Sequence, residues 1–147
     1  MTDTPTAPYW HLWADENGVS HQTQCVMSHF ELKSAQAPAA PQWQGQMTSG
    51  AMTAMVTVLP VGWIGEWHVN PKPQWIVPLS GRWFVESMDG TRIEMGAGES
   101  SFGGDQAAVE VEGKRGHRSG TVGEVPAVLM LVQFDDAPAP SAPCAFG

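Results

Sequence analysis

The sequence predicts an all-β protein that folds as a single domain. Its 147 residues include 16 glycines and 12 prolines. These residues separate short segments rich in Val, Met, Trp and Phe, as expected for strands joined by turns. A chain of this length can bury one hydrophobic core but is too short for two full domains. Many short strands in one small domain indicate a sandwich, a barrel or a jelly roll.

Local signals place and pair the expected strands. The dipeptide Asp89-Gly90 suits a two-residue hairpin turn with positive φ, so residues 82–88 should pair antiparallel with residues 91–95. Pro78 cannot donate to a strand ladder, so its strand lies at an edge, at a bulge or with that position facing away. In order, the expected strands are residues 10–14, 24–32, 51–59, 74–79, 82–88, 91–95, 117–122 and 127–134.

Composition divides the chain into a short N-terminal segment (1–9), the β domain (10–134) and a C-terminal tail (135–147). The tail alternates Pro with Ala and Ser and is expected to be disordered, because it cannot bury enough apolar surface to fold. Residues 34–50, rich in Ala, Pro and Gln, are expected to form a connecting loop anchored by Trp43.

Charge and the apolar runs limit the partners. Seven basic against fifteen acidic residues give a net charge of −8, which argues against nucleic acid and anionic membranes as partners. The N-terminus lacks a secretory pattern, and no apolar run approaches the roughly 18 residues of a membrane span. We therefore expect a cytoplasmic protein. Cys25 and Cys144 belong to no metal or redox motif and are expected to be reduced thiols.

The most specific motif runs from Gly62 to Gly81 and reads GWIGEWHVNPKPQWIVPLSG. Five residues separate Gly62 from His68, and Asn70 and Gln74 follow at short intervals. This spacing resembles the first metal-site motif of the cupins, in which a histidine stands at the position of Asn70 and a glutamate at that of Gln74. The wider pattern is similar to small single-domain bacterial cupins of unknown role.

The second cupin motif is matched less closely. Gly98 fits its first glycine, and the segment GKRGHRS supplies its histidine as His117, while Gly104 and Thr121 replace the usual proline and asparagine. The glycine-rich run GAGESSFGG is interpreted as turns, and residues 103–112 as an insertion. The resemblance implies a double-stranded β-helix, the cupin jelly roll, whose two sheets enclose one small-molecule cavity.

Alternation of side chains along a strand puts His68 and Asn70 on one face. The cupin register makes this face the inside of the barrel, and there His68 and His117 should converge. We therefore predict that these two histidines are the catalytic groups. The predicted ligand contacts are Asn70, Gln74, Trp75 and Met130.

Two versions of the site remain open. In one, His68, Gln74 and His117 hold a divalent Fe, Mn, Ni or Zn ion, which would require a carboxylate such as Glu66, Glu86 or Asp105 to reach inward. The other, equally favoured version is metal-free, because two imidazoles can carry out acid/base chemistry near neutral pH.

The predicted function is that of a small-molecule-binding protein, with the cavity acting as an isomerase, a dehydratase or other lyase, or a metal-assisted oxygenase. The alternative is a non-catalytic cupin that recognises a metabolite, and fold analogy does not choose between them. A homodimer is also expected, because aromatic side chains are enriched at interfaces. Its contact would use outward-facing members of the tryptophan cluster Trp63, Trp67, Trp75 and Trp83.

Overall fold

The structure is a computed structural model that describes residues 3–45, 50–136 and 141–144. Those residues form eleven β-strands and no helix, so the predicted all-β class is confirmed. The strands are β1 (Ala7–Ala14), β2 (Ser20–Met27), β3 (Glu31–Lys33), β4 (Gln42–Gln44), β5 (Met52–Leu59), β6 (Gln74–Ser80), β7 (Arg82–Ser87), β8 (Arg92–Gly96), β9 (Ser101–Gly104), β10 (His117–Val122) and β11 (Ala127–Phe134).

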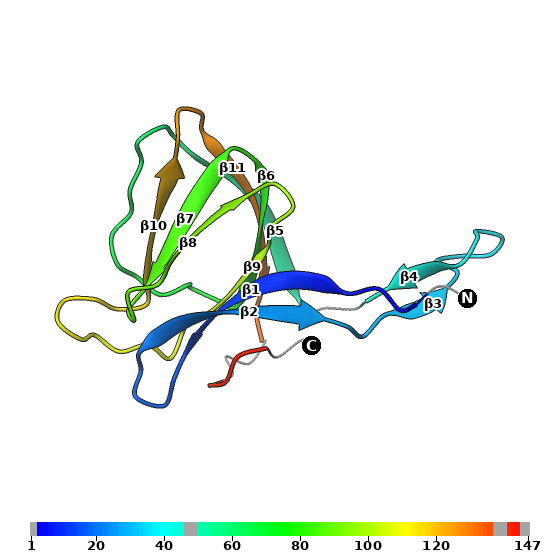
Figure 1. Cartoon of the computed structure of the whole chain (residues 1–147), viewed down its shortest axis with the longest axis horizontal. Helices are drawn as coiled ribbons and strands as arrows, with labels where there is room; N and C mark the ends of the chain where they lie inside the picture. The colour runs from blue at the N-terminus through cyan, green and yellow to red at the C-terminus, as the bar shows by residue number, and fades with distance from the viewer. Residues whose placement is uncertain (1–2, 46–49, 137–140, 145–147) are drawn as a thin grey trace.

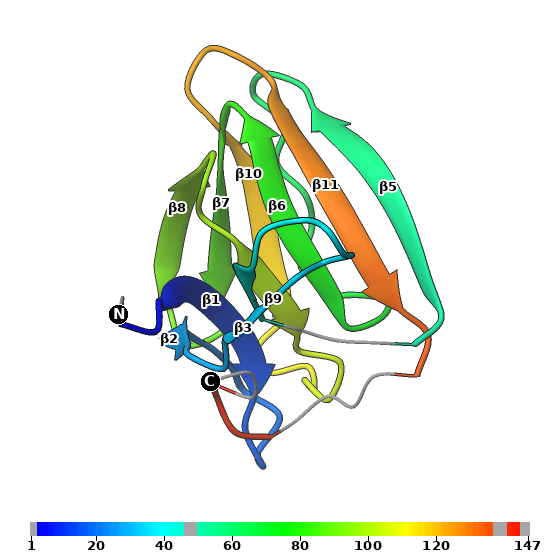
Figure 2. The same ribbon diagram turned by 90° about the vertical axis from the view of Figure 1, so that its right-hand side faces the viewer.

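The body of the molecule is built from two sheets that face each other, with the architecture of a jelly roll. The larger sheet has the order β2-β1-β9-β6-β11-β5, and the smaller has the order β10-β7-β8. The two sheets splay around an interior in Figure 1, and Figure 2 shows β5 at the edge of the larger sheet beyond β11. Only the β1–β9 pairing within these sheets is parallel.

The predicted hairpin at Asp89-Gly90 is confirmed. β7 and β8 pair antiparallel on either side of it, and Gly90 has a φ of 87°, which a side chain would disfavour. Pro78 lies in β6 opposite Leu129, next to a shift of register in β11. A bulge at this point fits the missing backbone donor of proline.

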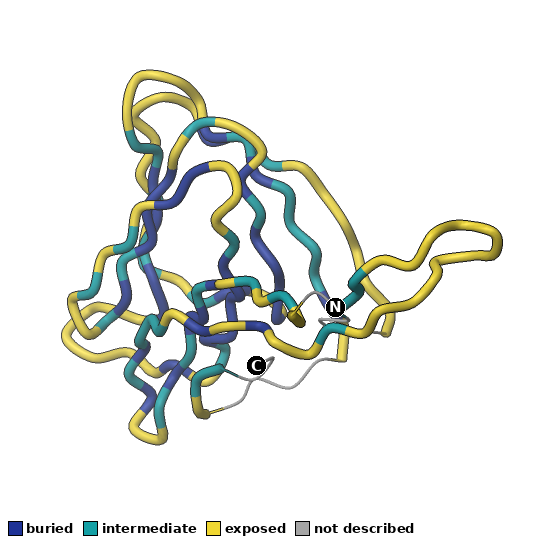
Figure 3. Tube along the Cα trace, turned by 45° about the vertical axis from the view of Figure 1, so that its right-hand side comes forward, coloured by how far each residue is buried: buried dark blue, intermediate teal, exposed yellow. Residues whose placement is uncertain are grey.

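Two hydrophobic clusters lie on opposite faces of the larger sheet, because successive side chains of a strand alternate. Ile76 belongs to the interior cluster between the sheets, whereas its neighbour Trp75 belongs to the outer cluster. Figure 3 shows the buried stretches of chain gathered in the body of the molecule. The interior cluster comprises Leu12, Leu59, Ile76, Trp83, Val85, Met95, Ala127 and Leu129. The outer cluster comprises Tyr9, Cys25, Met27, Trp75, Phe102 and Phe134.

Three expectations about the chain's organisation are wrong. Residues 34–50 do not form only a loop: β4 lies within them and pairs with β3 in an exposed hairpin that extends from the body (Figure 1). The glycine-rich run at residues 96–104, expected to be turns, has a turn at residues 97–98 but ends in β9, a strand between β1 and β6. The predicted outward tryptophan contact also loses two members, because Trp75 and Trp83 are 2% and 3% exposed within their own chain.

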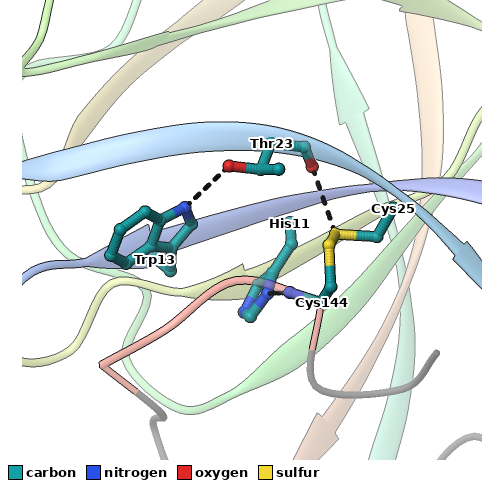
Figure 4. The surroundings of a disulfide bond; sticks show 5 residues. All are labelled: His11, Trp13, Thr23, Cys25 and Cys144. Atoms are coloured by element: carbon teal, nitrogen blue, oxygen red, sulfur yellow. Dashed lines mark hydrogen bonds between the residues drawn. A yellow bond between two sulfur atoms is a disulfide. The ribbon is translucent and has the colours of Figure 1, made fainter.

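The cysteines are not reduced thiols, because Cys25 and Cys144 form a disulfide across 119 residues of sequence. Figure 4 shows this bond beside His11, whose Nδ1 accepts a hydrogen bond of 3.0 Å from the Cys144 backbone N–H. Of the predicted disordered tail, residues 135–136 and 141–144 are described, and residues 141–144 are thus tethered to β2. Residues 137–140 and 145–147 lie outside the described residues. Nothing near either cysteine in the sequence signals this pairing.

Candidate functional site

A cavity of about 140 Å³ lies between the two sheets. Its walls are mostly apolar on the side of the larger sheet, and its polar groups gather where the motif segment meets β10. The described residues that line it are Thr57, Leu59, Trp63, His68, Asn70, Gln74, Ile76, Trp83, His117, Ser119, Leu129 and Leu131. The predicted interior face is therefore a real cavity.

The segment before β6 runs alongside β10 and holds the two histidines together. The backbones of His68 and His117 exchange two hydrogen bonds, of 3.0 and 2.9 Å. Two further bonds join Gly65 to Ser119 and Trp63 to Thr121. The imidazole rings lie 4.6 Å apart between centroids. The predicted convergence of His68 and His117 is observed.

Both imidazoles are oriented through Nδ1. The Nδ1 of His68 donates to the backbone oxygen of Glu66 at 2.7 Å, and the Nδ1 of His117 donates to Oδ2 of Asp105 at 2.7 Å. Carbonyl and carboxylate oxygens only accept, so in the neutral rings the proton sits on Nδ1 and the lone pair on Nε2. Nε2 is thus the ring nitrogen left for a ligand in the cavity.

Asp105 is fully buried behind His117, with an exposed fraction of 0%. Burial by itself would raise the pKa of its carboxyl group. The hydrogen bond and positive charge of His117, together with the hydrogen bonds from Asn70, outweigh burial and hold this pKa below its ordinary value. Asp105 is therefore a carboxylate at neutral pH and stabilises the cation that His117 becomes on taking up a proton.

A chain of side-chain amides supports this carboxylate. Asn70 donates its backbone N–H (2.9 Å) and its Nδ2 (2.8 Å) to Oδ1 of Asp105. Gln74 donates to Oδ1 of Asn70 at 2.6 Å, and Gln133 donates to Oε1 of Gln74 at 2.8 Å. Because the carboxylate can only accept, it fixes the direction of every bond in this chain. The two amides of the altered motif therefore orient Asp105.

Two glycines allow the network to pack this closely. A Cβ on Gly103 would lie 2.5 Å from three atoms of the Asn70 side chain. A Cβ on Gly116 would meet the backbone oxygen of His68 and approach Oδ2 of Asp105 at 2.9 Å, and Gly116 has a φ of 77°. Glycine is therefore needed at both positions for Asp105 to reach His117.

Two predicted ligand contacts lie away from the cavity. Trp75 packs against the outer cluster, with its ring centroid 5.4 Å from that of Tyr9 and 5.0 Å from that of Phe102. Met130 stands between Leu129 and Leu131, which line the cavity, so alternation turns its side chain to the other face. Both ligand contacts are wrong for the same reason. The sequence does not show which face of each strand is turned towards the cavity.

Asp105 is the functional residue that the motif did not identify. The sequence offers it only as one of several acids that could reach inward, and it lies in a segment interpreted as an insertion. The sequence signal for Asp105 is weak. Its position beneath His117 depends on Gly103 and Gly104 forming the end of a strand. Of the other two acids, Glu86 pairs with Arg118 at 2.8 Å, and Glu66 is exposed.

The residues present do not fit a resident divalent metal. Both polar atoms of the Gln74 side chain are engaged by other amides, and both oxygens of Asp105 are engaged by Asn70 and His117. Two imidazoles remain, whereas catalytic sites of this kind usually have three protein ligands. Among the described ranges, no group of three His, Cys, Asp or Glu residues is placed to hold a metal. The metal on His68, Gln74 and His117 stays a prediction without a supporting donor set.

Comparison with known proteins yields only distant structural likenesses. No family model matches the chain, and no curated protein matches it. One similar solved structure is a putative ethanolamine utilization protein, EutQ, from Salmonella typhimurium, with 15% identity over 92% of this chain and 99% of that one and a TM-score of 0.42. Another is protein NMB1881 from Neisseria meningitidis, with 18% identity over 63% of this chain and 84% of that one and a TM-score of 0.42.

These likenesses are too distant to carry an argument about function, so the fold class rests on the topology of this chain. None of the described segments is a helix that could cross a membrane.

Proposed function

We propose that the protein binds a small molecule between its sheets and that His117, oriented by Asp105, transfers a proton to or from it. The observation that carries this proposal is the 2.7 Å contact between Nδ1 of His117 and a fully buried carboxylate. A carboxylate in this position fixes the ring and supports the charge that develops during proton transfer. Nε2 then acts on the cavity side of the ring.

His68 supplies a second proton carrier. Its ring centroid is 4.6 Å from that of His117, but its Nδ1 is bonded to a backbone carbonyl and not to a carboxylate. One imidazole backed by a negative charge and one without it are well suited to serve as base and acid in the same reaction. Isomerisations and eliminations can use such a pair, because each removes a proton at one atom and delivers a proton at another.

A non-catalytic binding protein is the second candidate, and the amide chain favours it. Gln133, Gln74 and Asn70 form a hydrogen-bonded support that fixes the polar end of the cavity. A rigid, satisfied polar wall suits recognition of a metabolite as well as catalysis. Both candidates use the same cavity and differ in whether His117 exchanges protons with the ligand.

The test is a screen for proton exchange in deuterated water. Small uncharged hydroxy-ketones and ketones are incubated with the protein, and loss of C–H signals is followed by NMR. We expect His117→Gln to lower the rate for an active compound by about 100-fold or more, while the matched variant His29→Gln, at an exposed histidine, leaves it unchanged. Asp105→Asn should lower kcat more than it changes KM, because Asp105 acts through His117.

Equal rates in the wild type and His117→Gln for every compound would reject the catalytic proposal and leave the binding protein. Metal content of the untagged protein is measured on the same sample. Stoichiometric metal that disappears in His68→Ala would support the metal-dependent version of the site.

For the homodimer, we propose that the second copy pairs along β5. This strand is one of the two edges of the larger sheet, and Met52, Val56 and Val58 are 52%, 61% and 56% exposed. β5 carries no charge and no proline, although exposed edges usually carry such protection. In a chain with a net charge of −8, an uncharged strip is where two copies repel each other least.

Sedimentation of the wild type at micromolar concentration tests this contact. We expect a dimer that Val56→Lys converts to a monomer and that Val26→Lys, on the opposite edge strand, leaves intact. A monomeric wild type, or dissociation by Val26→Lys alone, would reject pairing along β5.

A further inference from the structure

The cavity wall contains a buried hydrogen-bond donor that the network around Asp105 does not use. Trp83 of β7 is 3% exposed and lines the cavity. Its Nε1–H has no hydrogen-bond partner among the described residues. Buried N–H groups in native proteins nearly always find a partner, from the protein, from water or from a ligand. This donor therefore indicates that the ligand of the cavity brings an acceptor.

The charge of the lining limits what that acceptor can be. Among the described residues that line the cavity, none is Lys, Arg, Asp or Glu. The nearest buried charge is the carboxylate of Asp105 behind His117. A carboxylate or phosphate entering this space would lose its water without a fixed positive partner and would face a negative group. An uncharged oxygen is the acceptor that fits.

The position of Trp83 separates this acceptor from the histidines. Trp83 pairs with Thr121, whereas His117 pairs with Ser87 at the other end of the same two strands. These positions are four residue steps apart along β10, which is roughly 13 Å of strand at about 3.3 Å per residue. Apolar side chains, including Ile76 and Leu129, line the space between the sheets.

We propose that the ligand is a small, uncharged, largely apolar molecule with a carbonyl oxygen that accepts a hydrogen bond from Nε1–H of Trp83, at the end away from His117. Its size is set by the 140 Å³ of the cavity, which is close to the roughly 150 Å³ that accommodates benzene in other proteins. This proposal rests on the cavity being the binding site but not on His117 being catalytic.

Binding of three probes of similar shape tests the proposal without requiring a reaction. Cyclohexanone carries the carbonyl, methylenecyclohexane has the same outline without an acceptor, and cyclohexanecarboxylate carries a charge. Each is titrated into the full-length protein with ¹⁵N-labelled tryptophan, and the indole N–H resonances are followed by NMR. The Trp83 resonance is assigned by its absence in Trp83→Phe, which keeps an aromatic ring but removes the donor.

We expect cyclohexanone to bind about fivefold to tenfold more tightly than methylenecyclohexane, the advantage of a typical hydrogen bond, and to shift the Trp83 N–H resonance. In Trp83→Phe the ketone should lose this advantage and bind more weakly than the hydrocarbon, because its carbonyl is then buried without a donor. The carboxylate should bind more weakly than either probe.

Equal affinity of ketone and hydrocarbon in the wild type, preference for the carboxylate, or no shift of the Trp83 resonance with any probe would overturn the proposal. The relative affinities in the wild type decide the matter even where Trp83→Phe does not fold. Because the titration is separate from the proton-exchange screen, its failure with an active His117 rejects only the ligand class. Success with no exchange rejects only the catalytic role.

Discussion

Two buried histidines, His11 of β1 in the larger sheet and His117 of β10 in the smaller sheet, are in contrasting environments. His11 and His117 are 0% and 4% exposed. Loss of water lowers the pKa of His11 from 6.5 to about 4, so it stays neutral, and it accepts a hydrogen bond from the backbone of Cys144. His117 instead donates to an ionised carboxylate. The comparison teaches that a histidine that is only buried serves as a structural group. A buried histidine that also donates to a carboxylate is suited to proton transfer.

Asp105→Ala should have the largest effect, because it leaves the polar groups of Asn70 and His117 buried without their shared acceptor. We expect a loss of about 3–5 kcal/mol in the free energy of unfolding, measured with urea. Asp135→Ala, which removes the acid of the exposed pair with Lys72, is the control and should cost less than about 1 kcal/mol. Similar losses for the two variants would show that the network does not stabilise the fold.

The stabilising contributions of His11 and Asp105 should be lost over different ranges of pH. His11 has a lowered pKa in the folded state, so its stabilising contribution is complete above its unfolded pKa of about 6.5 and is lost as the pH falls towards 4. The loss is roughly 3 kcal/mol by linkage. Asp105 also has a lowered pKa, so its contribution is lost only as the pH falls below about 4.

His11→Asn keeps an acceptor for the Cys144 N–H but does not titrate. It should abolish the decrease in stability between pH 6.5 and 4 and leave the decrease below pH 4 in place. Unfolding curves across this pH range would contradict the comparison if His11→Asn left the upper decrease unchanged.

The disulfide lies at the outer cluster, away from the cavity. Its removal should therefore lower the stability of the fold but change binding in the cavity little. Cys144→Ser is expected to lower the free energy of unfolding by about 2–4 kcal/mol, while affinity for cavity probes changes less than twofold. Reducing agent should lower the stability of the wild type to a similar level and leave the variant unaffected. Loss of probe binding in a folded Cys144→Ser would show that the two regions are coupled.

The smallest expected effect tests how closely the inner region is packed. Gly103→Ala would place a methyl group against the Asn70 side chain, and we expect a loss of about 1–3 kcal/mol from the strain. In a double-mutant cycle with Asn70→Ala the two losses should not add, because the methyl group then meets empty space. Additive losses would show that Gly103 does not act through Asn70.

Much of the site could be predicted from the sequence. Alternation put His68 and Asn70 on one face. The resemblance to the two cupin motifs turned that face inward and brought His117 to it, and all these residues and Gln74 line the cavity, although His68 itself is exposed. The roles of the two amides could not be predicted, because they follow from Asp105. That acid is 35 residues from Asn70, and the intervening glycines do not look like a strand.

The sequence by itself determined the all-β class and the Asp89-Gly90 hairpin, since each depends on residues close together in the chain. It gave the meeting of the two histidines only through the resemblance to the two cupin motifs. Only the tertiary structure decided that Asp105 lies beneath His117, that Cys144 reaches Cys25, and that Trp75 faces the outer cluster while Trp83 lines the cavity. These contacts join segments far apart in sequence or depend on which sheet face is covered. Local patterns carry neither kind of information, because packing between distant strands sets both.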